Sequence, residues 1–391
     1  MTEIFIEDTQ RTSPTIYVVG IGGGGNNAVE RMLPKEENAR NVHYFSINTH
    51  YHILADCKSE TIQIGKKITN GFGAGADPCI GEAAAKENED DIMSALSDAK
   101  MVILTCGLGG GTGTGAIPVI AGMCRAAGIL TIAVVTLPFT FEGRPRTEVA
   151  KSGLQKLRDQ VDTLLVIPND KLLQLNEKNL LVEDAFSIAD NILKYTIEGI
   201  TNIIYNKGVV NVDFNDLKTT FTNKGIAHIG ISVAHDGTPL IEAVRQAIES
   251  PLLDTDIKNA TNVLLNTSGH VNLLELNEAV SYVQEMTSPD TQIIWGTVTD
   301  PDVCSENDCI VTLIATGVQS HSLSGIPGTP KENRISPTTD SQQGSTDRKP
   351  TFFSYNSSSQ VKKKEPIVSP IDIPEFLKPS YGTRNVKKYS Y

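Results

Sequence analysis

Two glycine-rich segments contain the residues whose types and spacing could do chemistry in this chain. Residues 20–27 (GIGGGGNN) and residues 109–115 (GGGTGTG) each follow a short apolar run and precede a helical pattern. Glycines allow backbone amides to approach an anion closely, and the N-terminus of a helix favours negative charge. Thr112 and Thr114 add two hydroxyl groups to the second segment. Both segments are therefore predicted to bind phosphate.

The residues around these segments narrow the class of phosphate compound. Residues 20–25 match the GxGxxG pattern, which alone is a weak indication of a dinucleotide-binding fold. That fold needs an acidic residue at the end of the second strand to bind ribose hydroxyls, but residues 46–49 read SINT. The chain also contains no Walker A sequence. An NAD-dependent dehydrogenase is thus a disfavoured alternative, and an ordinary P-loop NTPase is excluded.

The segments lie at turns between alternating strands and helices. Strands are predicted at residues 15–19, 42–47, 101–105, 130–136 and 163–167, and helices at 27–33, 78–95, 117–127 and 146–160. This alternation predicts an α/β fold in which helices cover both faces of a parallel sheet.

A long amphipathic stretch follows this alternation. Apolar residues recur every three or four positions from Val182 to Ile204, and Gly208 ends the pattern. A helix of about 24 residues would extend about 36 Å and could act as a spine between two domains. Further strands are predicted at residues 226–233, 262–267, 292–299 and 310–315, with helices at 239–248 and 274–285. A smaller α+β domain is therefore expected after the spine helix.

Charge and composition exclude several classes of protein. The 391 residues carry a net charge of −12, although residues 319–391 are mildly basic, and this acidic body argues against binding of nucleic acid. No apolar stretch reaches the ~20 residues of a membrane helix, and the N-terminus lacks a signal peptide's apolar region. A cytosolic protein without membrane insertion is expected. The six cysteines include no CxxC pair, so free thiols are expected rather than a zinc site or disulfides.

A longer series of motifs identifies the family that the chain resembles. In order, the chain contains GIGGGGNNAV (20–29), INT (47–49), GFGAGADP (71–78), GGGTGTG (109–115), PFTFEGRPR (138–146), IPNDKLL (167–173), DAFSIAD (184–190), NVDFNDLK (211–218) and DIPEFLK (372–378). This series resembles the FtsZ family of bacterial cell-division GTPases, within the tubulin/FtsZ superfamily. The resemblance covers residues 16–317 and the C-terminal peptide, and it implies a tubulin-like GTPase fold.

The resemblance implies that GTP or GDP occupies the glycine-rich site. The residues expected around the phosphates are Gly22, Gly23, Gly24, Gly25, Asn26, Gly109, Gly110, Gly111, Thr112, Gly113, Thr114 and Gly115. Amides near the γ-phosphate would come from Ala74, Gly75 and Ala76. Magnesium is expected to accompany the nucleotide, coordinated mainly through its phosphates, and no metal ligand is assigned to the protein.

The resemblance also assigns the ribose and base contacts. Glu142 and Arg146 would meet the ribose and phosphate region, with a solvated surface ion pair as the alternative. Phe186 would stack on guanine, and Asp190, one helical turn later, would accept from its N1–H and N2 amino groups. Asn27 and Asn169 would complete the base and ribose contacts.

In the family, hydrolysis depends on assembly. Asn211, Asp213 and Asp216 follow the spine helix, whose length would separate them from the nucleotide of their own subunit. The resemblance implies a head-to-tail filament in which these residues complete the site of the next subunit and position water for attack on the γ-phosphate. Taken alone, an NxDxxD sequence would more often be simple turn chemistry.

The implied domains end in a tail that contacts other proteins. They are an N-terminal extension (1–14), the GTP-binding domain (15–181), the spine helix (182–207), the C-terminal domain (208–318), a flexible Ser- and Pro-rich linker (319–370) and a terminal peptide with a basic tail (371–391). Asp372 to Lys378 would bind membrane-tethering and regulatory division proteins. The implied location is the cytoplasmic face of the mid-cell division site, in the Z ring.

Some residues depart from the family pattern. His50 stands where an Asp usually follows INT, His52 replaces a common Gln, and Asn70 replaces an often basic residue. The first departure lies near the phosphate and metal region, so magnesium affinity or turnover could differ. A second hypothesis is therefore a nucleotide-binding paralogue that assembles but hydrolyses GTP poorly.

Overall fold

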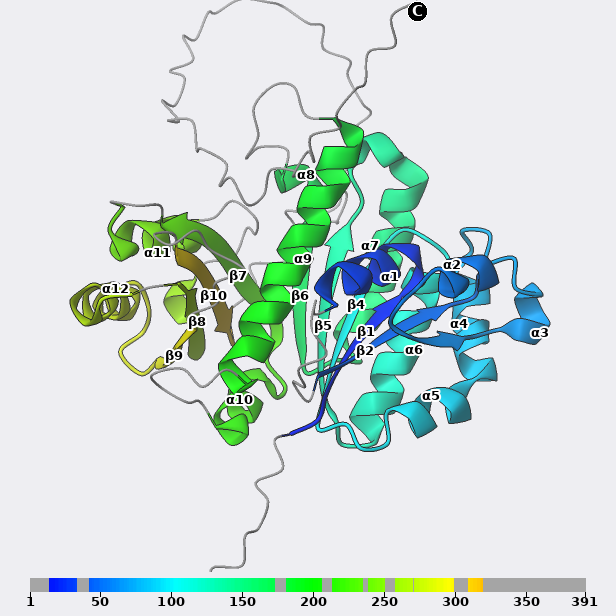
Figure 1. Cartoon of the computed structure of the whole chain (residues 1–391), viewed down its shortest axis with the longest axis horizontal. Coiled ribbons are helices and arrows are strands. Elements are labelled where there is room, and N and C mark those ends of the chain that lie inside the picture. Colours follow the sequence, from blue (N-terminus) through cyan, green and yellow to red (C-terminus); the bar gives the residue numbers. More distant parts are fainter. Residues whose placement is uncertain are drawn as a thin grey trace, which may run out of the picture. The chain divides into compact units, whose positions relative to one another are not determined.

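The described part of the chain contributes ten strands to one mixed sheet in the computed structural model (Figure 1). Their order across the sheet is β3-β2-β1-β4-β5-β6-β7-β10-β8-β9. The first six, which pair in parallel, are β1 (Ile16–Ile21), β2 (Val42–Asn48), β3 (Glu60–Gln63), β4 (Met101–Gly107), β5 (Leu130–Leu137) and β6 (Thr163–Pro168). The others are β7 (Gly225–Ala234), β8 (Asn262–Ser268), β9 (Gln292–Val298) and β10 (Cys309–Thr316).

The structure describes residues 14–33, 42–172, 181–205, 213–234, 238–249, 257–269, 271–298 and 309–318. The predicted linker (319–370) and terminal peptide (371–391) lie outside these ranges, as do residues 1–13, Asn211 and Cys304. The cysteines within them are free thiols. No helix in the described ranges is long and apolar enough to cross a lipid bilayer.

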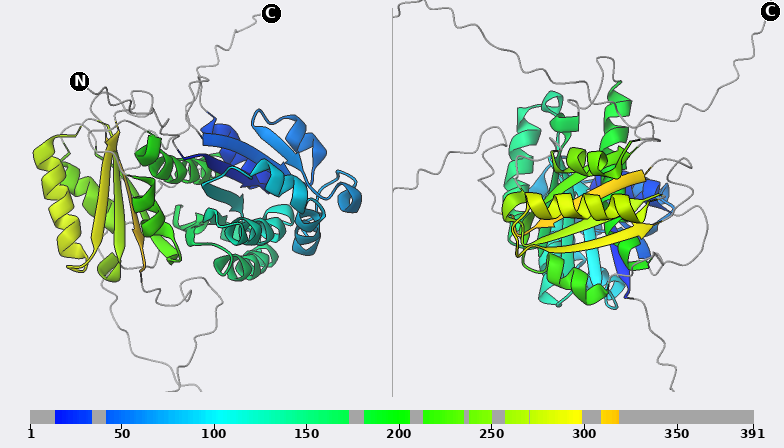
Figure 2. Two further views of the ribbon diagram at one scale, coloured as in Figure 1. Left: turned by 90° about the horizontal axis from the view of Figure 1, so that it is seen from below. Right: turned by 90° about the vertical axis from the view of Figure 1, so that its left-hand side faces the viewer.

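Helices cover both faces of the parallel strands, as the alternating pattern predicted (Figure 2). On one face, α1 (Gly22–Met32) packs against α9 (Val182–Tyr205). On the other, α6 (Thr112–Ala126) packs against α7 (Arg144–Arg158). Every residue of β1 and of β5 is buried, as expected for parallel strands with two covered faces.

The helix predicted over residues 78–95 is two helices, α4 (Pro78–Glu87) and α5 (Glu89–Ala95). The break occurs at Asn88, whose Oδ1 accepts from the N–H of Gly65 at 2.8 Å and whose amide donates to Asp91 at 2.7 Å. These contacts compete with helical hydrogen bonds, as Asn side chains often do. Four short helices were not predicted from the sequence: α2 (Tyr51–Ala55), α3 (Lys66–Thr69), α8 (Asn169–Leu172) and α10 (Phe214–Phe221).

The spine helix α9 is confirmed over 24 residues. Its apolar face, which includes Ile192, Leu193, Ile197 and Ile200, belongs to one core that also contains buried residues of β1, β4, β5, β7, β8 and β10. The helix therefore packs against strands from both halves of the sheet. Its first turn differs, because Val182 is 61% exposed and Phe186 is 39% exposed.

The C-terminal part has its own antiparallel pairings and its own core. Strand β10 pairs antiparallel with β7 and β8, and α11 (Leu240–Ile248) and α12 (Leu273–Met286) pack over a second apolar cluster. This arrangement confirms the expected α+β character. Its sheet is continuous with the first, because Thr163–Leu165 of β6 pair in parallel with Gly225–Ala227 of β7.

Candidate functional site

The predicted nucleotide-binding segments converge at one edge of the sheet. Gly22 directly follows β1, Gly109 follows β4, Glu142 follows β5 and Asn169 follows β6. The carboxyl ends of neighbouring parallel strands meet at the same edge, where α/β proteins bind ligands. The strand order therefore brings together segments that are more than 100 residues apart in the sequence.

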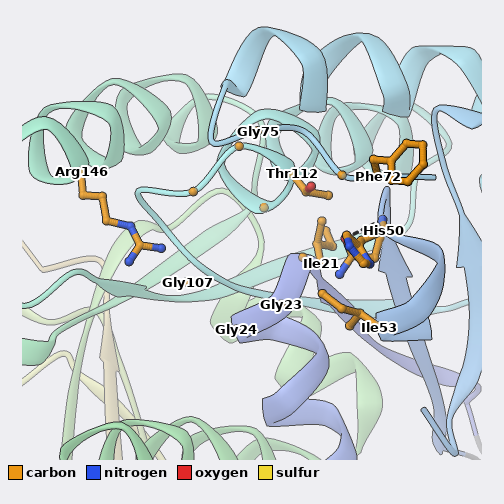
Figure 3. A pocket seen from close by; sticks show the side chains of 16 residues that line it. Ile21, Gly23, Gly24, His50, Ile53, Phe72, Gly75, Gly107, Thr112 and Arg146 are labelled. Carbon is orange, nitrogen blue, oxygen red and sulfur yellow. Dashed lines mark hydrogen bonds between the residues drawn. The ribbon is translucent and has the colours of Figure 1, made fainter. Parts of the chain in front are cut away.

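Both glycine-rich segments line a cavity of about 330 Å³ (Figure 3). We call it the phosphate cavity. Its wall includes Gly22, Gly23 and Gly24 from the first segment, Gly110, Gly111, Thr112 and Gly113 from the second, and Gly73, Gly75, Asn48, His50 and Arg146. Most of this wall is backbone, which presents N–H groups rather than large side chains to a ligand.

The glycines of the two segments serve different purposes. A Cβ at Gly25 would lie 2.4 Å from the carbonyl oxygen of Thr105, and one at Gly115 would lie 2.0 Å from that of Pro78, so packing requires these glycines. A Cβ at Gly23 or Gly110 would meet no protein atom within 4 Å, and neither has a positive φ. The lack of a side chain at these two positions keeps the cavity open, which fits a molecule that occupies it.

The helices next to these glycines begin earlier than predicted. The first helix was expected at residue 27 and another at residue 117, but α1 begins at Gly22 and α6 at Thr112. Glycine is a poor helix former. Close packing overrides that preference here, since Gly25 lies against β4 and Gly113 against Ile21. The first turns of both helices therefore form part of the cavity wall.

Several polar residues predicted to contact phosphate instead bond within the protein. Asn26 is 1% exposed and donates to the carbonyl of Gly20 at 2.9 Å, while its Oδ1 accepts from Asn48 at 2.7 Å. The hydroxyl of Thr114 accepts from the N–H of Gly109 at 2.9 Å, and that of Thr112 shares a 2.7 Å hydrogen bond with Thr49. These bonds fix the two hydroxyls in place, and because Thr114 accepts in its bond, its O–H remains a donor; the contact of both hydroxyls with phosphate stays a prediction.

Residues 70–77 form a tight segment above the second glycine-rich segment. Asn70, Gly71, Gly73, Gly75 and Ala76 all have positive φ. For Ala76, at +62°, this conformation is uncommon and unfavourable. Ala74 is buried, whereas Gly75 and Ala76 are exposed. The bend keeps the backbone of residues 75 and 76 accessible beside the cavity.

Glu142 and Arg146 form an ion pair one helical turn apart. The other carboxylate oxygen of Glu142 accepts from the N–H of Phe139 at 2.9 Å, so this carboxylate is held by the protein. The Arg146 side chain is 52% exposed and lines the phosphate cavity (Figure 3). The surface ion pair is thus present, and Arg146 is still placed to meet an anion.

Three phenylalanine rings cluster near the start of α9. Phe139 and Phe141 stack with ring centroids 4.9 Å apart, and Phe186 packs edge-on against Phe139 at 5.2 Å. Phe139 is buried, but Phe141 and Phe186 are 56% and 39% exposed. Sequence reasoning selected only Phe186. The PFTF sequence (138–141) contains the other two, but its pattern alone predicts no role for either ring.

Asp190 is held in an unusual environment. Its side chain is 16% exposed, and its Oδ2 lies 3.3 Å from Nε of Arg31 on α1. Burial raises the pKa of this carboxyl to about 6, although the Arg31 guanidinium opposes the shift. Arg31 was missed because the contact joins two helices that are distant in the sequence.

The two asparagines predicted to contact base and ribose differ in exposure. Asn27 is exposed on α1. Asn169 is 5% exposed at the start of α8, and its Oδ1 is buried without a hydrogen-bond partner. A buried acceptor without a partner is unfavourable and suits a site where a ligand supplies the donor.

Asp213 and Asp216 belong to the start of α10, which lies at the other end of α9 from α8 (Figure 1). Both are exposed, and Asp213 caps α10 by accepting from the N–H of Asn215 at 3.4 Å. At the other end of α10, the carbonyl of Phe221 accepts from Oγ1 of Thr163, the first residue of β6. The acidic pair therefore belongs to the amino edge of the parallel strands, and the cavity to their carboxyl edge.

The cavity does not supply the carboxylates that bind magnesium in many proteins. Among its described lining residues there is no Asp or Glu. The described chain also contains no cluster of three or more His, Cys, Asp or Glu side chains that could hold a metal ion. The described residues therefore do not form a protein-held Mg²⁺ site.

Comparisons with known proteins match both halves of the chain. Residues 15–177 match the Tubulin/FtsZ family GTPase domain, and residues 225–319 match the FtsZ family C-terminal domain. An empty dimer of FtsZ from M. jannaschii is 43% identical, with a TM-score of 0.74, and the match covers 79% of this chain and 89% of that chain. CetZ2 from Haloferax volcanii, solved as a GTPγS-bound protofilament, is 20% identical, with 80% and 96% covered and a TM-score of 0.67; this likeness shows the fold alone.

Proposed function

The chain belongs to the FtsZ family of tubulin-like GTPases, and from this premise we propose how its own residues bind GTP and hydrolyse it between subunits. It is a filament-forming GTPase of cell division. The observation that carries the proposal is the separation of two sets of residues: the phosphate cavity lies at the carboxyl ends of the parallel strands, whereas α10, whose start contains the exposed Asp213 and Asp216, contacts the amino end of β6.

The phosphates of GTP occupy the phosphate cavity. Gly23 and Gly110 leave the space open, and the first turns of α1 and α6 direct backbone N–H groups into it. Arg146 adds a cationic donor at one side. The accessible backbone at Gly75 and Ala76 meets the γ-phosphate. Mg²⁺ bound to GTP would neutralise phosphate charge, and the residues of the cavity would hold it only through the nucleotide.

Guanine lies at the exposed rings of Phe141 and Phe186. An aromatic surface stacks on any base, so it contributes affinity without selecting guanine. Selection comes from the Asp190 carboxylate, which accepts two hydrogen bonds from the N1–H and N2 amino groups of guanine. Adenine has no such pair of donors. Arg31 favours the ionised form of Asp190 that this contact requires.

Hydrolysis takes place where two subunits meet. From Asp190 to the end of α9 the helix continues for 15 residues, which corresponds to about 22 Å, and α10 lies beyond that end. Asp213 and Asp216 therefore serve the GTP of the neighbouring subunit, where they orient water, with Asn211 outside the described residues as their companion. Such a reaction depends on positioning and electrostatics, so no covalent nucleophile is needed. A head-to-tail interface of this kind does not close on itself and yields a filament.

The remaining assignments concern the cell. We propose that the domains have the boundaries predicted from the sequence and that Asp372 to Lys378 form the peptide that binds membrane-tethering and regulatory proteins. A filament tethered in this way would act at the cytoplasmic face of the mid-cell division site. Removal of residues 372–378 should leave assembly in vitro unchanged and abolish binding to such partners.

Mixing two inactive variants tests the shared site. Asp213→Ala should retain GTP binding as a dilute monomer but lose hydrolysis, whereas Gly110→Ala should bind GTP too weakly to be occupied at a low GTP concentration but keep its acidic residues. Mixed filaments of the two place an intact acidic pair against an occupied cavity, so part of the GTPase activity should return. A flat activity across all mixing ratios, with co-sedimentation of both variants, would contradict catalysis between subunits. A low rate in the unmixed wild-type chain at every protein concentration would favour the poorly hydrolysing paralogue.

A further inference from the structure

His50 occupies a fixed place in the wall of the phosphate cavity (Figure 3). Its backbone N–H donates to Oδ1 of Asn48 at 3.2 Å, and it pairs with Phe72 in an isolated antiparallel bridge. Its ring packs against Gly73, because a Cβ on that glycine would stand 3.4 Å from the ring. These contacts hold the imidazole beside the segment that leads to Gly75.

The lining of the cavity can bind an anion without the help of a metal cation held by the protein. Figure 3 shows Arg146 on one side of the glycine backbone and His50 on the other. Arg146 carries a positive charge and both side chains can donate hydrogen bonds, whereas none of the cavity's described lining residues is acidic. A triphosphate in this space would meet donors on both sides and no carboxylate that repels it.

The imidazole also has an unmet hydrogen-bonding need. Nδ1 of His50 is buried and has no hydrogen-bond partner. A buried polar atom in this condition is unfavourable, and such atoms concentrate where a ligand or a functional rearrangement satisfies them. Because Nδ1 has almost no accessible surface in this structure, the ring has to rotate before a phosphate oxygen in the cavity can become its partner.

We propose that His50 is a nucleotide-binding residue that donates a hydrogen bond to the γ-phosphate, so that this chain binds GTP with little dependence on Mg²⁺. The proposal rests on the proposed function, in which GTP occupies this cavity and residues 74–76 meet the γ-phosphate. A carboxylate at position 50 would do the opposite. It would repel the phosphates in the absence of metal and would attract Mg²⁺ when metal is present.

The test compares the metal dependence of GTP and GDP affinity in the full chain and its His50 variants. Affinity is measured by calorimetry on dilute protein, in EDTA and in excess MgCl₂. The wild-type chain should lose no more than about threefold in GTP affinity on chelation, whereas His50→Asp should lose at least about tenfold and recover with Mg²⁺. GDP affinity should respond less in both proteins. His52→Asp is the matched control, because it makes the same change at an exposed position that does not line the cavity.

A second pair of variants tests the proposal if His50→Asp does not fold. His50→Gln keeps an N–H donor and should stay within about threefold of wild type in EDTA, whereas His50→Ala should lose about tenfold for GTP. The proposal fails if wild-type GTP binding collapses in EDTA, if His50 and His52 variants behave alike, or if His50→Gln and His50→Ala are equal. If the wild-type chain binds no GTP even with Mg²⁺, it is the proposed function that fails.

Discussion

The proposed phosphate-binding end and the proposed base-binding end of the site are built in different ways. The phosphate end is mainly backbone, from Gly22–Gly24 and Gly110–Gly113 at the starts of α1 and α6. The base end consists of side chains from α9, α1 and the turn after β5: Phe186, Asp190, Arg31, Phe139 and Phe141. Backbone N–H groups bind any phosphate chain, so this end should supply affinity, and the carboxylate at the other end should supply selection.

The largest expected effect comes from filling the phosphate cavity. Gly110→Ala and Gly23→Ala add a Cβ that meets no protein atom but occupies ligand space, so GTP and GDP affinities should both fall. An overpacked methyl group costs about 1–3 kcal/mol, equivalent to about ten- to hundredfold in affinity. Fluorescent-nucleotide titration measures the loss.

The melting temperature separates the two kinds of glycine. Without nucleotide, Gly110→Ala should have the same melting temperature as the wild type. Gly25→Ala should melt at a lower temperature, because its Cβ would lie 2.4 Å from the carbonyl oxygen of Thr105. Equal melting temperatures for these two variants would mean that the division into packing and cavity glycines is wrong.

Asp190→Asn should have a smaller effect, which is confined to recognition of the base. The amide can accept from only one guanine donor and adds N–H groups where donors already face it, so GTP affinity should fall by roughly tenfold or more. Binding of ATP should not weaken. Competition between GTP and ATP for a fluorescent analogue measures the change in selectivity. Glu183→Gln, an exposed neutralisation on the same helix, is the control and should retain wild-type selectivity.

The smallest expected effect is the pH dependence that Asp190 gives to the free energy of unfolding. The pKa of Asp190 is raised from 3.8 to about 6 by burial, so between these pH values the folded chain holds a proton that the unfolded chain has released. The ligand-free fold therefore loses stability as pH rises from about 4 to about 6, by up to about 3 kcal/mol, and the loss persists at neutral pH.

Replacement of this carboxylate should remove the loss. At pH 7, Asp190→Asn should melt a few degrees above the wild type without nucleotide, and the difference should shrink or reverse towards pH 4.5. Melting curves in matched buffers test this expectation. A difference that does not vary with pH would show that ionisation of Asp190 is not its cause.

Much of the fold and most of the glycine-rich wall of the cavity could be predicted from local patterns. Alternating apolar runs located the strands from β1 to β6 apart from the short β3, and the period of α9 located the spine helix to within a few residues. The predicted helix bounds that are wrong were changed by contacts between residues that are distant in the sequence. Helix starts at Gly22 and Thr112 contradict glycine's poor helix propensity, because packing that no window of sequence reveals overrides it. Asn88 interrupts a helix through a contact with Gly65, 23 residues away.

Composition and spacing alone determined three features: the glycine-rich backbone at two strand-to-helix turns, the length of the spine helix and the acidic residues beyond it. These features depend on short-range conformational preferences. Tertiary structure decided which glycines face the cavity, how Arg31 meets Asp190, which hydroxyls are already bonded and that the acidic pair lies at the edge opposite the cavity. The reason is physical: hydrogen bonds, burial and electrostatic contacts act between atoms that are close in space, and the order of strands in the sheet brings those atoms together.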